Sequence, residues 1–195
     1  MLRTKTRTGT DAISMLKKDH VKVKGLFDRF EDAEETSEKK SIAEEACAEL
    51  KVHAAIEEEM FYPALRQKME DEDGLLDEAD EEHHEAKILV AELGLMSGDE
   101  ENFDAKFTVL AENIRHHIKE EEGELFPQAK KTEIDFDALG EQMMARKKEL
   151  MAGGVPEGPE SEMVSKYGLM KESPSRKAQK TFEVPVAEKR RARKH

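Results

Sequence analysis

The sequence predicts an all-α protein, an antiparallel up-down four-helix bundle with a short fifth helix and a disordered C-terminal tail. The composition favours helices over sheet, because 39% of the residues are charged and only 5% are aromatic. Apolar residues recur at the alternating steps of three and four that are typical of buried helix faces. A motif of histidine and glutamate occurs twice, which indicates that two similar helix pairs build one bundle.

The apolar spacing predicts five helices and short connections between them. The expected ranges are about 11–31, 37–69, 73–96, 102–131 and 136–151. Ser97, Gly98 and Asp99 form a stop and turn between the third and fourth helices. Pro63 and Pro127 are expected to kink or end the second and fourth helices. Short connections favour antiparallel neighbours.

A change of composition after Met151 predicts a domain boundary. The segment 153–159 is rich in glycine and proline, as linkers are. Residues 152–195 carry ten Lys or Arg against six Asp or Glu, and they end in a basic run at 189–195. We therefore expect a metal-binding bundle over 11–151 and a flexible, basic-ended tail over 152–195.

Charge and cysteine content exclude several classes of protein. The net charge of −13 argues against nucleic acid as the main partner, because phosphate binding needs positive charge. Cys47 is the single cysteine, so no internal disulfide can form. The N-terminus lacks the apolar stretch of a signal peptide, and no run approaches the roughly 18 apolar residues of a membrane span. These features predict a soluble, cytoplasmic protein without a membrane partner, and they leave its oligomeric state open.

The internal repeat is the most informative feature of the chain. The segment 53–63 matches 117–127: both read H-x-x-x-E-E, then two residues, an apolar residue, an aromatic residue and proline. Upstream, Asp19-His20 matches Glu82-His83, and the first and second histidines are 33 residues apart in one copy and 34 in the other. Each helix pair thus contributes one histidine and then an H-x-x-x-E.

Four histidines and two glutamates fall on the apolar seams of their helices. Their apolar seam neighbours include Leu16 and Val23 on the first helix, and Ala86 and Val90 on the third. His84 and His116 fall on solvated faces instead, so the histidine next to each should point inward. The seam residues are His20, His53, Glu57, His83, His117 and Glu121.

Buried glutamates without a basic seam partner point to bound cations. Burying an unpaired carboxylate is costly, and no Lys or Arg on the seams could neutralise Glu57 or Glu121. A divalent cation solves this problem, and neutral imidazoles complete its shell. Six ligands are too many for one tetrahedral zinc, so we expect two metals with bridging carboxylates. Mixed nitrogen and oxygen donors with room for an added ligand suit iron or manganese, and bundle cores are known hosts for such pairs. We expect two iron ions, with manganese or zinc as the alternatives.

These motifs, Asp19-His20, His53-x-x-x-Glu57, Glu82-His83 and His117-x-x-x-Glu121 with the F-Y-P and L-F-P segments, resemble the hemerythrin family. The similarity is to bacterial hemerythrin-like HHE cation-binding domains, over about 11–131 and up to 151. It implies a hemerythrin-like bundle with a non-haem di-iron centre, in which Glu57 and Glu121 bridge and the four histidines are terminal ligands. Oxygen-carrying hemerythrins have a fifth histidine where this chain has Lys87, so water, Glu58 or a displaced His84 could complete the shell.

The resemblance predicts a protein that binds or senses oxygen or iron, with dioxygen, nitric oxide or peroxide as its small ligand. The alternative is a di-iron enzyme acting on peroxide or nitric oxide, although the sequence shows no catalytic residue and no substrate pocket. A third interpretation is an adaptor whose basic tail docks on an anionic surface. The acidic residues beside the ligands, Glu58, Glu59, Glu120 and Glu122, are expected to form a solvated face.

Overall fold

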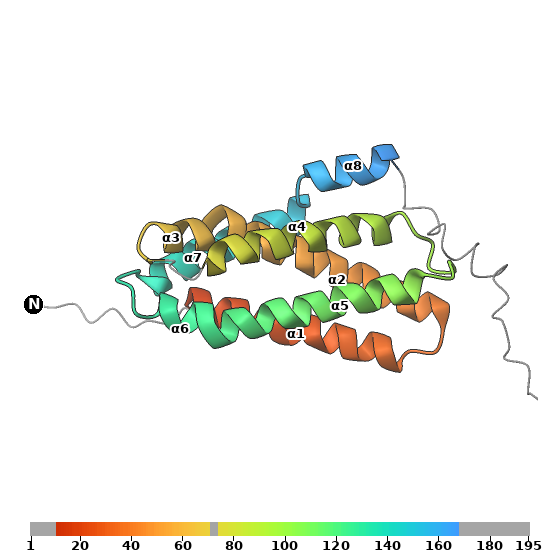
Figure 1. Cartoon of the computed structure of the whole chain (residues 1–195), viewed down its shortest axis with the longest axis horizontal. Coiled ribbons are helices and arrows are strands. Elements are labelled where there is room, and N and C mark those ends of the chain that lie inside the picture. Colours follow the sequence, from red (N-terminus) through yellow and green to blue (C-terminus); the bar gives the residue numbers. More distant parts are fainter. Residues whose placement is uncertain (1–10, 71–73, 168–195) are drawn as a thin grey trace, which may run out of the picture.

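A computed structural model of the chain describes residues 11–70 and 74–167, which are helical throughout apart from short connections (Figure 1). The α-helices are α1 (Ala12–Asp32), α2 (Thr36–Ile56), α3 (Tyr62–Arg66), α4 (Leu75–Gly94), α5 (Phe103–Glu120), α6 (Phe126–Ala129), α7 (Phe136–Gly153) and α8 (Pro159–Tyr167). Two π-helical turns, η1 (Glu57–Phe61) and η2 (Glu121–Leu125), follow α2 and α5. No strand occurs in the described ranges.

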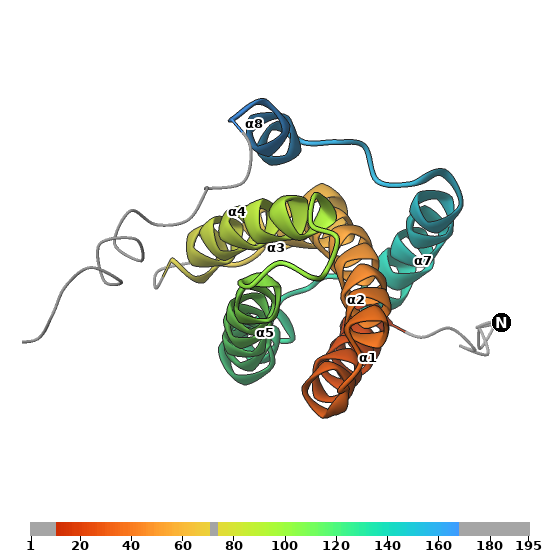
Figure 2. The same ribbon diagram turned by 90° about the vertical axis from the view of Figure 1, so that its right-hand side faces the viewer.

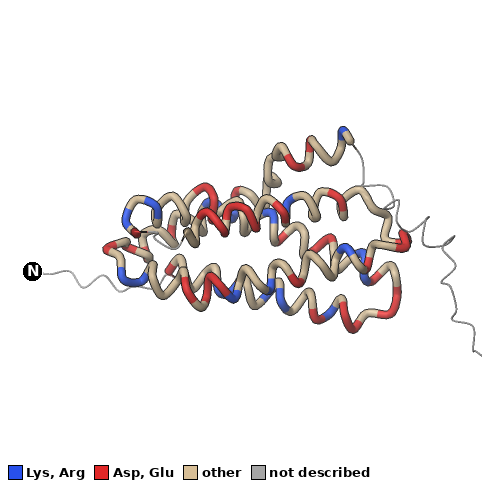
Figure 3. The backbone as a smooth tube through the Cα atoms, viewed as in Figure 1, with Lys and Arg blue, Asp and Glu red and all other residues tan. Residues whose placement is uncertain are grey.

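Helices α1, α2, α4 and α5 form an antiparallel four-helix bundle, which confirms the predicted fold class (Figures 1 and 2). The five expected helices agree with the structure to within three residues when α2, η1 and α3 are counted as one helix and α5, η2 and α6 as another. Helix α7 packs against α1 and α2 on the outside of the bundle. Acidic and basic residues are interspersed along the helices (Figure 3). None of the described helices has the length and apolar character needed to cross a membrane.

Local sequence signals account for where the helices begin. Asp11 caps α1 by accepting a hydrogen bond from the Ser14 N–H at 3.0 Å. Asp135 caps α7 in the same way, through the N–H groups of residues 137 and 138. Gly74 precedes α4 with a φ of 72°, in the left-handed region that side chains other than glycine rarely adopt. These caps fix the register of helices that carry the seam residues.

The two prolines lie just after the π-helical turns. In η1 the Tyr62 N–H donates to the Glu57 carbonyl, and in η2 the Phe126 N–H donates to the Glu121 carbonyl, each five residues back. A proline lacks its own N–H and clashes with the carbonyl four residues earlier in a regular helix. The widened turn accommodates Pro63 and Pro127, so the helix continues beyond them as α3 and α6. Each π-turn therefore begins at a glutamate of the seam, as such turns often do at functional sites.

The C-terminal segment differs in part from the expected disordered tail. Residues 159–167 form α8, which packs on α4 and buries Val164. This helix has too few apolar residues to stand out in the sequence. A few buried contacts with α4 hold it in place. Residues 168–195, with the basic run at their end, lie outside the described residues.

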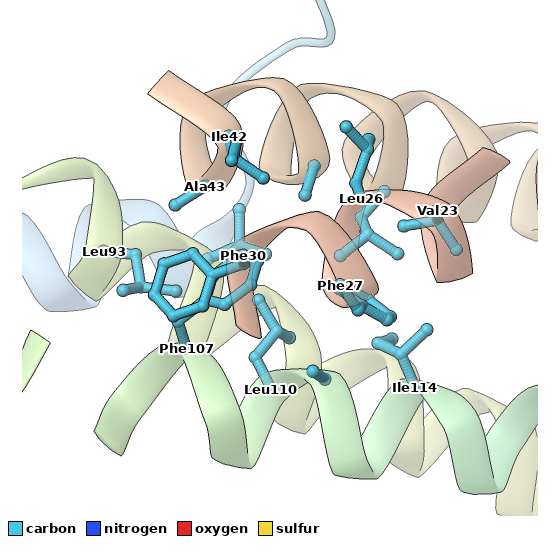
Figure 4. Packing of buried hydrophobic residues seen from close by; sticks show 14 of the residues in the cluster. Val23, Leu26, Phe27, Phe30, Ile42, Ala43, Leu93, Phe107, Leu110 and Ile114 are labelled. Atoms are coloured by element: carbon cyan, nitrogen blue, oxygen red, sulfur yellow. The ribbon is translucent and has the colours of Figure 1, made fainter. Parts of the chain in front are cut away.

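Two hydrophobic clusters fill the bundle on either side of the seam histidines. The first, near the α1–α2 and α4–α5 connections, contains Phe27, Phe30 and Phe107 (Figure 4). The second, toward the opposite end, contains Phe61 and Phe126. In the sequence of its own helix, each seam histidine lies between a residue of the first cluster and a residue of the second. The four imidazoles thus lie in a polar layer between two apolar ones.

Candidate metal centre

The structure brings the six predicted ligand side chains together in this polar layer. All six are buried, and the most exposed of them is His53 at 8%. They form two groups whose ligand atoms lie within 4.8 Å of one another: His20, His53, Glu57 and Glu121 in the first, and Glu57, His83 and His117 in the second. Because Glu57 belongs to both groups, the arrangement suits two ions that share a carboxylate.

Each glutamate lies between one histidine of its own helix pair and one of the other pair. Glu57 Oε2 is 3.1 Å from His53 Nε2 and 3.4 Å from His83 Nε2. Glu121 Oε2 is 3.2 Å from the Nε2 of His20 and 3.6 Å from that of His117. The sequence repeat therefore appears in space as an approximate twofold arrangement, with a carboxylate in each half placed to bridge.

A second carboxylate faces the outer ring nitrogen of every histidine. The Nδ1 distances are 2.9 Å for His20 to Glu122, 3.6 Å for His53 to Asp19, 2.9 Å for His83 to Glu58 and 2.7 Å for His117 to Glu82. An ionised carboxylate only accepts hydrogen bonds, so Nδ1 of His20, His83 and His117 carries the proton and donates it. His53 Nδ1 faces Asp19 beyond hydrogen-bond distance. The inner Nε2 of a neutral ring then presents a lone pair to the centre, which is the tautomer that metal-binding histidines use.

The centre consequently contains acceptors that lack donors. The Nε2 atoms of His83 and His117 are 3.2 Å apart, although neutral rings in this tautomer offer two lone pairs there. Several buried atoms have no hydrogen-bond partner among the described residues: His20 Nε2, His53 Nε2, Glu57 Oε1, Glu57 Oε2 and Glu121 Oε2. Buried acceptors without donors are costly, and cations satisfy nitrogen and oxygen acceptors together. The donor set thus fits iron, manganese or zinc.

The electrostatics of the protein without metal reflect the same crowding of acceptors. Burial and the neighbouring Glu121 raise the pKa of Glu57 well above its ordinary value. Burial lowers the pKa of His53 to about 4, which keeps its imidazole neutral. Burial also opposes a charge on His20, but its contact with Glu121 outweighs that effect and raises its pKa. Without metal, protons on Glu57 and His20 therefore supply part of the positive charge that bound cations would supply.

Tyr62 is a site residue that the sequence analysis did not single out. Its buried hydroxyl donates to Glu121 Oε1 at 3.1 Å and lies 3.5 Å from His83 Nε2. The matching residue of the other repeat is Phe126, whose ring stacks on His20 at a centroid distance of 5.8 Å. This tyrosine–phenylalanine difference was visible in the repeat and could have marked the position. It makes the two halves of the centre chemically unequal.

The expectation of a solvated acidic face is wrong for Glu58 and Glu122. Both hold ring nitrogens of seam histidines, and Glu58 also accepts from Lys87 Nζ at 2.6 Å. Periodicity places them beside the seam, but it does not show that another helix brings a histidine within reach. The prediction holds for the remaining two: Glu59 pairs with Arg146, and Glu120 pairs with an exposed histidine.

The structure also orients the histidines that precede or follow a seam residue. His84 is half exposed and bonds Glu160 of α8 at 2.8 Å. His116 is also exposed and lies 3.1 Å from Glu120. In the described chain neither belongs to the two buried groups, and neither does Glu58. His83 and His117 are thus the inward histidines, as the spacing predicted, and Lys87 supports an outer carboxylate.

A cavity of about 420 Å³ opens on the histidine layer, where the sequence had shown no pocket. All four seam histidines line it, together with apolar residues of the first cluster and the segment 155–161. Leu50 and Ile114 are among the apolar residues of its wall. A small molecule in this cavity would therefore lie against the imidazoles.

Weakening an outer carboxylate should weaken metal binding without removing an inner donor. Glu82→Gln leaves a neutral partner for His117 Nδ1, so we expect a loss of about 10–100-fold in metal affinity. Competition with a chelator of known affinity measures it. Glu85→Gln, an exposed residue on the same helix, is the matched control. An equal loss in both variants would contradict the role assigned to Glu82.

Comparisons with known proteins agree with this geometry. A family model described as the hemerythrin HHE cation binding domain matches residues 11–129. A crystal structure of a hemerythrin HHE cation-binding domain-containing protein from Mycobacterium kansasii is similar, with 26% sequence identity and a TM-score of 0.63. The similarity covers 73% of this chain and 88% of that one. A comparison with curated proteins gave no match.

Proposed function

The chain belongs to the hemerythrin HHE cation-binding domain family, and from this premise we propose that it is a non-haem di-iron protein that binds or senses oxygen or iron. The family match and the buried histidine–glutamate groups make it a metal-binding helical protein. The proposed ligands of the two irons are His20, His53, Glu57, His83, His117 and Glu121. The observation that carries the proposal is the buried set of inward-facing acceptors that lack donors.

The number and kind of ligands support a pair of irons. The two groups share Glu57, and a single tetrahedral ion would use four of the six side chains. Mixed imidazole and carboxylate donors suit iron, and helix bundles are known hosts of paired metals. Manganese or zinc would fit the same donors less well as a centre that leaves room for an added ligand.

The protein's own residues would position the ions and control what reaches them. The outer carboxylates orient the imidazoles with Nε2 inward, and Tyr62 holds Glu121 through its hydroxyl. Apolar residues of the first cluster form the wall of the cavity beside the histidine layer. Bound iron would supply the redox-active centre at which dioxygen, nitric oxide or peroxide can coordinate.

A second candidate is a di-iron enzyme that acts on peroxide or nitric oxide. Tyr62 is the observation that favours it, because a buried phenol beside Glu121 can donate a proton within the site. Turnover of peroxide by the purified protein, abolished in Tyr62→Phe while metal content is unchanged, would support this candidate. Stoichiometric binding without turnover would exclude it.

Absorption spectroscopy tests the first candidate. The purified full-length chain, reduced without oxygen and then exposed to it, should develop near-UV bands that require both iron and oxygen. Elemental analysis of the same sample gives the metal present. A chain that contains no iron and shows no oxygen-dependent band would contradict the proposal.

A further inference from the structure

The cavity beside the histidine layer is larger than a diatomic ligand requires. Protein interiors are close-packed, with few voids larger than a water molecule, whose share of liquid volume is about 30 Å³. At about 420 Å³ this cavity has the size of a site for an organic molecule. Its walls are mainly apolar and include Leu50, Ala86, Val90 and Ile114. Four glutamates also line it, each beside a basic side chain: Glu58 with Lys87, Glu59 with Arg146, Glu157 with Lys51 and Glu160 with His84. A space of this kind suits an apolar chain.

The segment between α7 and α8 forms one wall of the cavity. It leaves α7 at Gly154, whose φ of 81° lies in the left-handed region, and passes over to α8 (Figure 2). Residues 155–161 line the cavity. An ion pair of Glu157 with Lys51 at 3.8 Å and a hydrogen bond of Glu160 with His84 at 2.8 Å hold them. The wall is thus built from residues beyond the family match, which ends at residue 129.

The opposite end of the cavity is chemically different from its walls. There the four imidazoles of the polar layer face the space. Two divalent ions would outweigh the charges of Glu57 and Glu121, and lysines pair three of the four outer carboxylates: Lys87 with Glu58, Lys147 with Asp19 and Lys17 with Glu122. That end would then be positive, with room for an oxygen donor. A molecule that matches both ends has an apolar chain and one anionic oxygen-donor head.

We propose that this cavity binds a medium-chain monocarboxylate, with its chain among the apolar residues and its carboxylate at the histidine layer. The assignment of the head group rests on the proposed function, because it requires the bound ions. The assignment of the chain rests on the cavity itself, which the apolar residues and the 155–161 segment enclose. The metal centre would then recognise an organic ligand in addition to a small gas.

Calorimetric titration of decanoate into the metal-loaded full-length chain tests the proposal. We expect saturable binding of one decanoate per chain, at least about tenfold tighter than binding of decyltrimethylammonium. The cation has the same chain and the opposite charge. Since the chain carries a net charge of −13, non-specific attraction would favour the cation, so a preference for decanoate is informative.

Two variants locate the binding in the cavity. Ala86→Phe places a ring in the space, and Val155→Asp places a charge in the wall formed by the α7–α8 connection. Each should weaken decanoate binding by about tenfold or more. Val109→Phe and Met163→Asp introduce the same two side chains at exposed positions. Both should bind decanoate as the unchanged chain does. Circular dichroism and metal content of all four show whether they are folded.

The outcomes separate this inference from the proposed function. Saturable decanoate binding that both cavity variants weaken supports the cavity, and a preference over the cation supports the head group. A metal-loaded chain that does not bind decanoate, or that binds it equally in the cavity variants, overturns the inference alone. A chain without metal that binds decanoate overturns the proposed function and the head-group assignment, and it supports the apolar site.

Discussion

Replacing His53 and His117 together by alanine is expected to remove nearly all bound metal. Each buried group loses one nitrogen donor, because His53 belongs to the first group and His117 to the second. Glu57 and Glu121, with one histidine left in each group, are too few donors to hold two ions. Elemental analysis of the purified variant and of the unchanged chain, prepared side by side, measures the loss.

The same variant should also unfold more easily. An ion that binds the folded chain and not the unfolded chain adds about 4 kcal/mol at a free concentration of 1,000 times its dissociation constant. Loss of binding removes that contribution and lowers the midpoint of thermal unfolding. His84→Ala/His116→Ala alters the two exposed neighbours and is the matched control. If the control lost as much metal as the buried pair, the inward assignment would be wrong.

Replacing Glu57 by glutamine should have opposite effects in the presence and absence of metal. With iron, the variant loses the carboxylate that both groups share, and its affinity should fall sharply. In excess chelator, it should be more stable than the unchanged chain by about 1–3 kcal/mol at pH 7, because the unchanged chain must either bury the Glu57 charge or protonate Glu57 above its ordinary pKa. The glutamine amide can in addition donate to a ring Nε2. Chemical denaturation at pH 7 under both conditions measures the two effects.

The expected gain in stability of Glu57→Gln without metal follows from the pKa of Glu57, which burial and Glu121 raise in the folded chain. Ionisation of such a group opposes folding once the pH exceeds its ordinary pKa, so the penalty is present at neutral pH. A neutral side chain removes it. Glu59→Gln, at an exposed carboxylate paired with Arg146, is the control. It should change the free energy of unfolding by no more than a few tenths of a kcal/mol, both with iron and in chelator. A glutamine variant that is less stable than the unchanged chain in chelator would contradict the assignment of Glu57 to a cation site.

The residues that face the core could be predicted because orientation on a helix is a local property. A period of 3.6 residues and the apolar neighbours suffice to choose His83 over His84 and His117 over His116. The repeat then indicates that the chosen side chains come from matching heights of two helix pairs. For the same reason the five-helix order and the all-α class followed from the sequence.

Contacts between helices could not be predicted in this way. Glu58 reaches His83, and Glu122 reaches His20, across pairs of helices whose relative rotation no sequence period specifies. The cavity depends in the same way on how a connection far along the chain folds back over the bundle. The hydroxyl of Tyr62 likewise reaches Glu121 on another helix. The boundary after residue 151, the cytoplasmic location and the identity of the metal stay predictions.

Anomalous X-ray scattering from crystals of the full-length chain, recorded on both sides of the iron absorption edge, tests the central claim most directly. The account predicts two iron peaks per chain among the inward-facing nitrogen and oxygen atoms of the polar layer, with Glu57 in contact with both. A single peak, a peak outside that layer, or an empty layer in crystals grown with iron would contradict it.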